Sequence, residues 1–286
     1  MTFTVVARDA QTGDVGVAVQ SKFLAVGSVV PHAKAGVGAI GTQALVHIGY
    51  GTEGLRLLEA GLSPAEALRS LVTADDLPER RQVAIVGTDG SVAHHTGTGC
   101  TGYAGAIEGP GWVVMGNMLT GPEVLDEMAD YLGRTDESRL AHRLVACLRA
   151  GASRGGDRRG QQSAAVLVCR PRGSYGGHGD RLVDLRIDDS TVPIEDLARI
   201  LELHDLHFGH PDPDSLLPLE GEIEKQVYRA LRQVGRDPGG RAGLWPVLES
   251  WAGINNVEER MTTQGMIDPV VLKLLLEQAA CTEMSP

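Results

Sequence analysis

The N-terminal segment MTFTVVARDAQTGDVGVAVQSKF has the alternating pattern of a β-hairpin. Phe3, Val5 and Ala7 fall on one side of an extended chain, which predicts a first strand. The turn signal DAQTGD follows, and residues 15–20 have the pattern of the returning strand. We therefore expect a strand that starts next to Thr2 and turns back on itself.

Further along the chain, short Val- and Ala-rich runs bounded by Gly and Asp predict more strands. Asp89-Gly90 lies between two of these runs and predicts the turn of a second hairpin. The predicted strands cover residues 36–43, 81–87, 91–97, 111–118, 162–170 and 182–189.

Helices are predicted between the strands, and most of them come in pairs. Residues 51–75 have apolar positions at helical spacing and contain two helices. Ser63 predicts the N-cap of the second, with Pro64 in its first turn and Glu66 at the capping-box position. Apolar spacing also predicts helices within residues 120–134, 137–156 and 193–209.

This order of elements indicates the α+β class. Pairs of helices between runs of antiparallel strands do not match a Rossmann fold, in which strands and helices alternate singly. We expect a four-layer αββα sandwich at residues 1–210. The proline-rich segment 211–218 predicts a linker, and 219–286 predicts a small helical domain.

Composition narrows the range of functions. The net charge of −11 argues against nucleic acid and anionic membrane surfaces as partners. No apolar run approaches the roughly 20 residues of a membrane span, and no secretory signal precedes the first strand. We therefore expect a cytoplasmic protein. The four cysteines form no CxxC pair, and His94-His95 lacks an evident third ligand, so neither a metal nor a cofactor is expected.

Thr2 is the first candidate for chemistry. A hydroxyl is a poor nucleophile until a base takes its proton. A free α-amine has a pKa of about 7.7–8.0 and can act as that base in the same residue. Threonine is small enough for the initiator methionine to be removed before it. The alternative is that threonine stands at this position by chance.

Lys22, His32 and Gln43 are candidates to surround Thr2. Lys22 follows the returning strand of the hairpin, where an ammonium could lower the pKa of the amine or orient the hydroxyl. The alternative is a solvated lysine at a strand end. His32, near Lys34, is open to the same two interpretations. Gln43 ends a predicted strand and joins His32 as a candidate for substrate binding.

Two loops carry the remaining candidates. Gly116 and Asn117 stand where a predicted strand leads toward a helix, and N–H groups in such a turn can stabilise an oxyanion. An ordinary tight turn is the alternative. In GGDRRGQQS, Asp157 could support a hydroxyl or amine, and Arg158 or Arg159 could bind a carboxylate; mutually paired charges in a loop are the alternative.

Several motifs together resemble one bacterial and archaeal family, the domain of unknown function 1028. They are the N-terminal hairpin quoted above, VGSVVPHAKAGVGAIGTQAL, YGTEGLRLLEAGLSPAEAL, MGNMLTGPEVLDEM, GGDRRGQQSAAVLV and VDLRIDDSTVPIEDLARILELH. The resemblance runs from residue 2 to about 211. Residues from about 217 to 280 resemble a peptidoglycan-binding domain that accompanies some members.

The resemblance implies the fold of N-terminal-nucleophile hydrolases, the αββα sandwich of proteasome β subunits. It places Thr2 at the nucleophile, Gly116-Asn117 at the oxyanion turn, and Asp157 and Ser163 in the loop that supports the nucleophile. The lysine of those enzymes falls near Pro31–Lys34. Lys22 stands where they carry an acid, which is a departure from their pattern.

We expect an amidohydrolase that cleaves a C–N bond in a small amide or amino-acid-like substrate, with Thr2 as its nucleophile. Two alternatives stay open. The first is a ligand-binding or scaffold protein on the same fold, and the second is a cell-wall-associated protein. Compact sandwiches of this type often pair through their helices, so we also expect a homodimer or larger oligomer.

Overall fold

The structure is a computed structural model that describes residues 2–283. The chain forms two compact units, unit 1 at residues 1–201 and unit 2 at residues 202–286. The division falls within helix α5 (Pro193–Phe208), ahead of the proline-rich segment where the sequence predicts a linker. None of the helices within residues 2–283 combines the length and apolar character that crossing a bilayer requires.

Unit 1 contains a six-stranded antiparallel sheet, here called sheet A, with strand order β10-β9-β2-β1-β8-β7. Strand β1 therefore has neighbours on both edges. The strands are β1 (Thr2–Arg8), β2 (Val15–Ser21), β7 (Tyr103–Gly109), β8 (Trp112–Leu119), β9 (Ser163–Cys169) and β10 (Arg181–Ile187).

A second antiparallel sheet, sheet B, has the order β3-β4-β5-β6. Its strands are β3 (Pro31–Lys34), β4 (Gly38–Ala44), β5 (Arg81–Gly87) and β6 (Val92–Thr96). The helices of unit 1 are α1 (Ile48–Glu59), α2 (Pro64–Thr73), α3 (Glu123–Arg134), α4 (Leu140–Ser153) and α5, most of which lies in this unit. Single 3-10 turns occur at η1 (Val26–Ser28), η2 (Pro78–Arg80) and η3 (Tyr175–Gly177).

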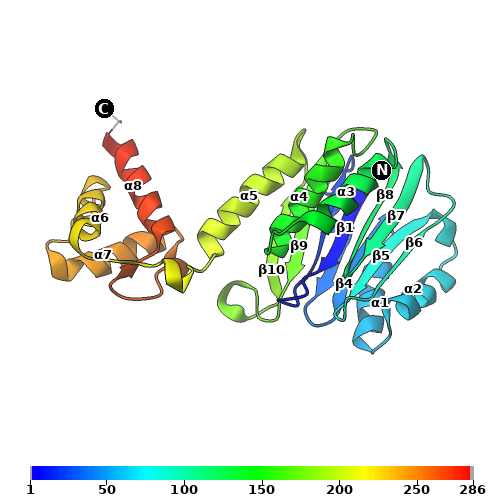
Figure 1. The fold of residues 1–286 in the computed structure, drawn as a ribbon, viewed down its shortest axis with the longest axis horizontal. Helices are drawn as coiled ribbons and strands as arrows, with labels where there is room; N and C mark the ends of the chain where they lie inside the picture. The colour runs from blue at the N-terminus through cyan, green and yellow to red at the C-terminus, as the bar shows by residue number, and fades with distance from the viewer. Residues whose placement is uncertain (1, 284–286) are drawn as a thin grey trace. The chain divides into compact units, whose positions relative to one another are not determined.

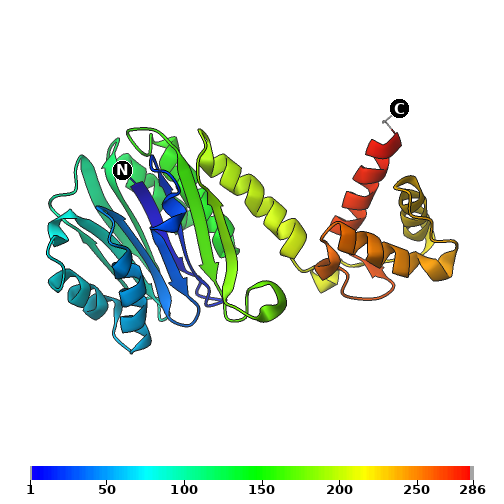
Figure 2. The same cartoon turned by 180° about the vertical axis from the view of Figure 1, so that it is seen from behind.

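Four clusters of buried apolar side chains hold unit 1 together, and the smallest of them joins sheet A to the segment around η1. One joins sheet A to α3, α4 and α5, and includes Phe3, Leu144 and Leu197. Another combines side chains from both sheets, such as Val6. A third joins sheet B to α1 and α2, and includes Ile40. Figure 1 shows α3 and α4 beside sheet A and α1 and α2 beside sheet B, and Figure 2 shows the same ribbon from behind.

Strand β1 takes part in two of these clusters because its side chains alternate. Phe3 and Val5 belong to the cluster shared with the helices, whereas Val6 belongs to the cluster shared by the two sheets. Thr2 and Thr4 lie on the same face of the strand as Val6, since side chains two residues apart share a face. The first hydroxyl of the strand is thus on the side that meets sheet B.

Most predicted elements are confirmed, and the two strands of unit 1 that were not predicted are both edge strands. Ser63 caps α2 with the full capping box. Strands β3 and β7 have no counterpart among the predicted strands, and they lie at the ends of sheets B and A. Most of their residues are only partly buried, so they lack the apolar alternation that marks a strand in the sequence.

Unit 2 is mostly helical. Its helices are α6 (Gly221–Gln233), α7 (Arg241–Ile254) and α8 (Pro269–Glu283), and β11 (Leu217–Pro218) pairs with β12 (Met266–Ile267). Single 3-10 turns are η4 (Pro213–Ser215) and η5 (Glu258–Arg260). Its own apolar core includes Leu231, Leu248 and Trp251. Buried Arg260 donates a hydrogen bond to Asp268 at 2.7 Å and to the carbonyl of Leu206 at 2.9 Å.

Helix α1 approaches sheet B closely at Gly51. A Cβ atom at Gly51 would lie 2.2 Å from Cγ of His32 on β3. The His32 imidazole packs between β3 and α1. It cannot move away from Gly51 without losing its packing contacts. Burial in this position lowers the pKa of His32, although its ring nitrogen lies 3.3 Å from the Val30 carbonyl oxygen.

We expect Gly51→Ala to destabilise unit 1 by about 1–3 kcal/mol, because the new methyl group overlaps the His32 ring. Chemical denaturation followed by circular dichroism measures the change. Gly133→Ala on α3 is the matched control, because a Cβ there meets nothing within 4 Å. That substitution should stabilise its helix by about 0.5–1 kcal/mol. Equal effects of the two substitutions would contradict the close approach.

A buried ion pair anchors the end of α2. Asp75 and Arg81 are linked by a 2.6 Å ion pair and are 5% and 9% exposed at their side chains. Tyr50 of α1 donates a 2.8 Å hydrogen bond to the same carboxylate. The hydrogen bond from Arg81 is the main reason that the pKa of Asp75 lies far below its ordinary value.

We expect Asp75→Asn to cost about 3–5 kcal/mol at neutral pH, because it leaves the Arg81 charge buried without its counter-ion. The folded-state pKa of Asp75 lies below the unfolded value of about 3.9. The wild type should therefore lose this stability as the pH falls below about 4, and the variant should show less of that loss. Urea denaturation across pH 3–7 measures both. Glu53→Gln breaks only the exposed pair with Arg56 and should change little.

Candidate functional site

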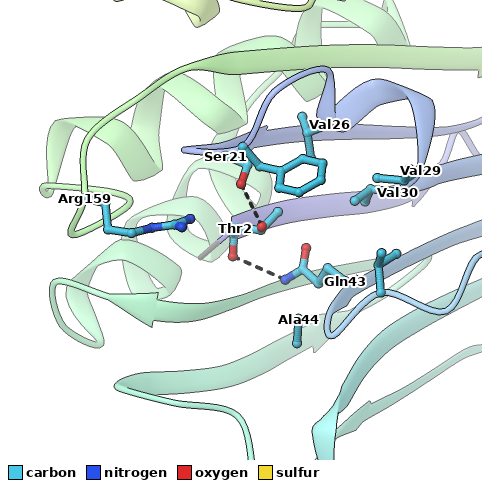
Figure 3. Close-up of a pocket in the computed structure, with 10 residues that line it drawn as sticks. Thr2, Ser21, Val26, Val29, Val30, Gln43, Ala44 and Arg159 are labelled. Atoms are coloured by element: carbon cyan, nitrogen blue, oxygen red, sulfur yellow. Dashed lines mark hydrogen bonds between the residues drawn. The ribbon is translucent and has the colours of Figure 1, made fainter.

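A cavity of about 210 Å³ opens beside the start of β1 (Figure 3). Its wall is built from the start of β1, the end of β2 with the η1 segment behind it, the end of β4, and the loop before β9. The residues that line it are Thr2, Ser21, Phe23, Val26, Val29, Val30, Gln43, Ala44, Val46 and Arg159.

Thr2 lies deep in this cavity and is only 7% exposed. It pairs with Ser21 of β2 on one side and with Asn117 of β8 on the other. Its hydroxyl oxygen lies 3.0 Å from the Ser21 hydroxyl oxygen, and either group can be the donor. Two neighbouring strands and one hydrogen bond therefore fix the position of this hydroxyl.

A network of buried amide side chains lies behind Thr2. The Gln82 side-chain oxygen accepts hydrogen bonds from Gln43 at 2.8 Å and from Asn117 at 2.9 Å. Gln43 also donates to the Thr2 carbonyl at 3.3 Å, and its own oxygen accepts from the Thr4 hydroxyl. The two glutamines and Asn117 are at most 3% exposed. Their hydrogen bonds link both sheets just beneath the cavity.

The Gln82 amide nitrogen, like the side-chain oxygen, has hydrogen-bond partners in both sheets. It donates toward the carbonyls of Gly116 at 2.8 Å and Gly105 at 3.0 Å, and toward the Thr96 hydroxyl at 3.0 Å. A satisfied network of this kind specifies one arrangement, because each buried group that loses its partner costs about 1–3 kcal/mol. Gln82 and Ser21 were not predicted as site residues. An isolated glutamine inside the apolar run RQVAIVG was the available signal.

Asp157 and Ser163 hold the loops around the cavity. The buried Asp157 carboxylate accepts from the backbone N–H groups of Lys22 and Arg159, both at 2.9 Å. The Arg159 guanidinium lies 3.3 Å from the same carboxylate. The Ser163 hydroxyl donates to the Phe23 carbonyl and accepts from the Val26 N–H at 3.1 Å. Both residues fix the segment that leads into η1, and neither contacts the Thr2 hydroxyl in the described structure.

Four other predicted residues point away from the cavity or lie outside its lining. The Lys22 ammonium is on the surface and donates to the Gln161 carbonyl at 3.2 Å. His32 packs under α1 as described above. Arg158 does not line the cavity, whereas its neighbour Arg159 does. Lys34, which the family resemblance predicts near Thr2, forms an exposed ion pair with Glu59.

The structure corrects the prediction for Gly116 and Asn117. They do not form a turn, because β8 continues to Leu119 and α3 begins only at Glu123. Gly116 pairs with strands on both sides, and Asn117 pairs with Thr2. Strand pairing uses this segment to hold β1 in place, so the predicted turn between a strand and a helix does not form at these residues.

Ala44 introduces strain into the cavity wall. Its φ is 71°, in the left-handed region that a residue with a Cβ rarely adopts. The chain turns here from β4 toward α1, and the turn brings Val46 into the lining. Strain of this kind costs of order 1–3 kcal/mol and persists where the surrounding structure imposes it.

Comparison with known proteins now identifies the family. Residues 2–197 match the family described as "Family of unknown function (DUF1028)". The chain belongs to the DUF1028 family. Residues 207–275 match a second family, described as "Putative peptidoglycan binding domain".

One solved DUF1028 structure supports this assignment. The crystal structure of protein SPO2555 from Silicibacter pomeroyi is similar, with a TM-score of 0.64 and 26% identity. The similarity covers 78% of this chain and 92% of that chain. No curated protein matches this chain. The description of the family assigns it no function.

We expect Gln82→Met to destabilise unit 1 by about 2–4 kcal/mol, because Gln43 and Asn117 lose the oxygen that both donate to. Urea denaturation measures the change. Thr96→Val serves as the control, since it removes a single acceptor at the edge of the network and should cost about 1 kcal/mol. If the two variants lose similar amounts of unfolding free energy, Gln82 is no more important to the network than a residue at its edge, and the prediction is contradicted.

Proposed function

We propose that the DUF1028 unit of this protein is an N-terminal-nucleophile amidohydrolase with Thr2 as its nucleophile. The corresponding fold is a four-layer αββα sandwich. Three observations support that layering: one apolar cluster is shared by sheet A and α3–α5, one by the two sheets, and one by sheet B and α1–α2. Sheet A carries Thr2 on the strand at its centre.

The observation that carries the proposal is the Thr2 hydroxyl itself. It is buried at a cavity, and its hydrogen-bond partner within residues 2–283 is the Ser21 hydroxyl. A serine hydroxyl can orient this group but is not a base. The base must be supplied by another group, and the α-amine of Thr2 is suited to that role once Met1 has been removed. Met1 lies outside the described residues.

The reaction then follows in two steps. The Thr2 oxygen attacks the amide carbonyl carbon while its proton moves to the α-amine. The C–N bond breaks as that proton passes to the leaving nitrogen, and the acyl group stays on Thr2 as an ester. Water then attacks the ester carbonyl carbon as the same amine takes one of its protons. The bond between the acyl carbon and the Thr2 oxygen breaks, that oxygen takes the proton back from the amine, and the acid is released. The Ser21 hydroxyl orients the Thr2 oxygen for the first attack.

A small substrate fits the cavity. Its volume of about 210 Å³ lies below the 300–1,000 Å³ range of typical ligand pockets. Among the ten described residues of the lining, Arg159 alone is charged, and it supplies a guanidinium for a substrate carboxylate. The substrate proposed is therefore a small amide or amino-acid-like compound.

The proposal is tested by treating the purified full-length protein with a β-lactone that acylates N-terminal threonines. Intact-mass and peptide mass spectrometry should show a protein without Met1 and with one acyl group on Thr2. Thr2→Ala should abolish that adduct. Thr52→Ala is the control, since it removes an exposed threonine hydroxyl on α1 and should leave labelling unchanged.

Retention of Met1 on a protein that still hydrolyses amides would overturn the mechanism. Absence of a Thr2 adduct, with the fold intact by circular dichroism, would favour a ligand-binding or scaffold role for the same cavity.

A second candidate function rests on unit 2. Its match to the peptidoglycan-binding description favours attachment to the cell wall rather than a cytoplasmic location. Purified peptidoglycan sacculi should then bind the full-length protein saturably, and cellulose, an insoluble polysaccharide without peptide stems, should not. Equal retention by both materials would contradict this candidate.

A further inference from the structure

The cavity at Thr2 has two chemically different sides. Val26, Val29, Val30 and Val46 supply an aliphatic wall, whereas Arg159 is the charged member of the lining. In Figure 3 the Arg159 side chain lies on one side of Thr2, and Val29 and Val30 lie on the other. A substrate whose reacting bond sits at Thr2 therefore meets an aliphatic surface in one direction and a guanidinium in the opposite direction.

The aliphatic side is compact and rigid. Val26 and Val30 are only 1% and 2% exposed, and they pack with Val19 and Ala165 of sheet A. Valine is restricted at χ1, so this wall keeps its shape when empty. The hydrogen bond from the Val26 N–H to Ser163 further fixes the η1 segment. A short branched aliphatic group fits such a wall, whereas a charged group there would lose its hydration without compensation.

The rim of the cavity continues this apolar character. Phe23, which lines the cavity, is 51% exposed. Its ring therefore extends the apolar lining toward the solvent. Like the valine wall, this ring offers no polar partner to a charged group.

The opposite side is prepared for an anion. Arg159 is 41% exposed at its side chain, and buried Asp157 fixes both its backbone N–H and its guanidinium. A guanidinium that is already oriented loses less entropy when it binds a carboxylate. No acidic residue is among the ten that line the cavity. An anion can therefore approach here even though the chain as a whole carries a net charge of −11.

We infer that the substrates of this site are N-acyl amino acids with a short branched aliphatic acyl group. The inference rests on the proposed function. The acyl group occupies the valine wall, the scissile amide lies at Thr2, and the carboxylate of the amino-acid portion binds Arg159. The reaction consumes one water: the C–N bond of R–CO–NH–CHR′–COO⁻ breaks, and R–COO⁻ and ⁺H₃N–CHR′–COO⁻ are formed.

The test compares three amides with the full-length protein. N-isovalerylglycine has both recognition groups, N-acetylglycine lacks most of the aliphatic group, and N-isovaleryl-ethanolamine lacks the carboxylate. Release of the amine, measured by mass spectrometry, gives kcat/KM for each. We expect N-isovalerylglycine to exceed each of the other two by about tenfold or more. Thr2→Ala should remove all three activities.

Two variants with matched controls assign each preference to its side of the cavity. Val46→Phe should fill the aliphatic side and lower kcat/KM for N-isovalerylglycine about tenfold or more, with a much smaller effect on N-acetylglycine. Its control is Val192→Phe at an exposed position away from the cavity. Arg159→Gln should bring N-isovalerylglycine down to the level of the ethanolamine amide. Its control is Arg69→Gln, at an exposed position on α2.

The outcomes separate this inference from the proposed function. If the β-lactone fails to label Thr2, the proposed function fails, and the inference fails with it. If Thr2 is labelled but the three amides react equally, or none of them reacts, the inference alone is overturned. A preference that survives both Val46→Phe and Arg159→Gln would likewise overturn it, because the selection would then come from residues elsewhere.

Discussion

The placement of β1 at the centre of sheet A is the constraint on which the rest of the structure depends. Its two edges are paired with β2 and β8, and its two faces contribute to two different apolar clusters. A strand held in this way has a single register, because a shift by one residue would exchange its faces. That register places the Thr2 hydroxyl on the face that meets sheet B and opposite Ser21.

The amide network extends this constraint from one sheet to the other. Gln82 on β5 accepts from Gln43 on β4 and from Asn117 on β8, so one side chain sets the distance between strands that belong to different sheets. Apolar packing alone would let the two sheets slide by small amounts against each other. Directional hydrogen bonds between them prevent this sliding. These amide side chains therefore fix the floor of the cavity beside Thr2.

The sequence predicted the central strands, the helix pairs and the capped start of α2, because burial on regular faces leaves a periodic pattern. It also placed Thr2, Gln43 and Arg159 in a candidate site, and all three line the cavity. It did not identify Ser21 or Gln82, whose positions depend on strand register and on contacts between sheets. Gly116-Asn117 looked like a turn because glycine and asparagine favour turns, but pairing with β1 and β7 overrode that local preference.

The position of Thr2 on the central strand also ties the site to the cooperative unfolding of the unit. Local opening in proteins begins at loops, termini and sheet edges, and central strands open only with the whole structure. Thr2 starts a strand whose partners lie on both edges, so motions of the edge strands β3 and β7 leave its hydrogen-bonded neighbours in place. Thr2 is the first residue of its strand, and chain ends fray readily, but its pairing with Ser21 and Asn117 holds it from both sides. The geometry at the hydroxyl should therefore persist at temperatures where the surface of the unit already fluctuates. On further heating, this geometry would be lost in the same cooperative transition that unfolds the core, and not gradually beforehand.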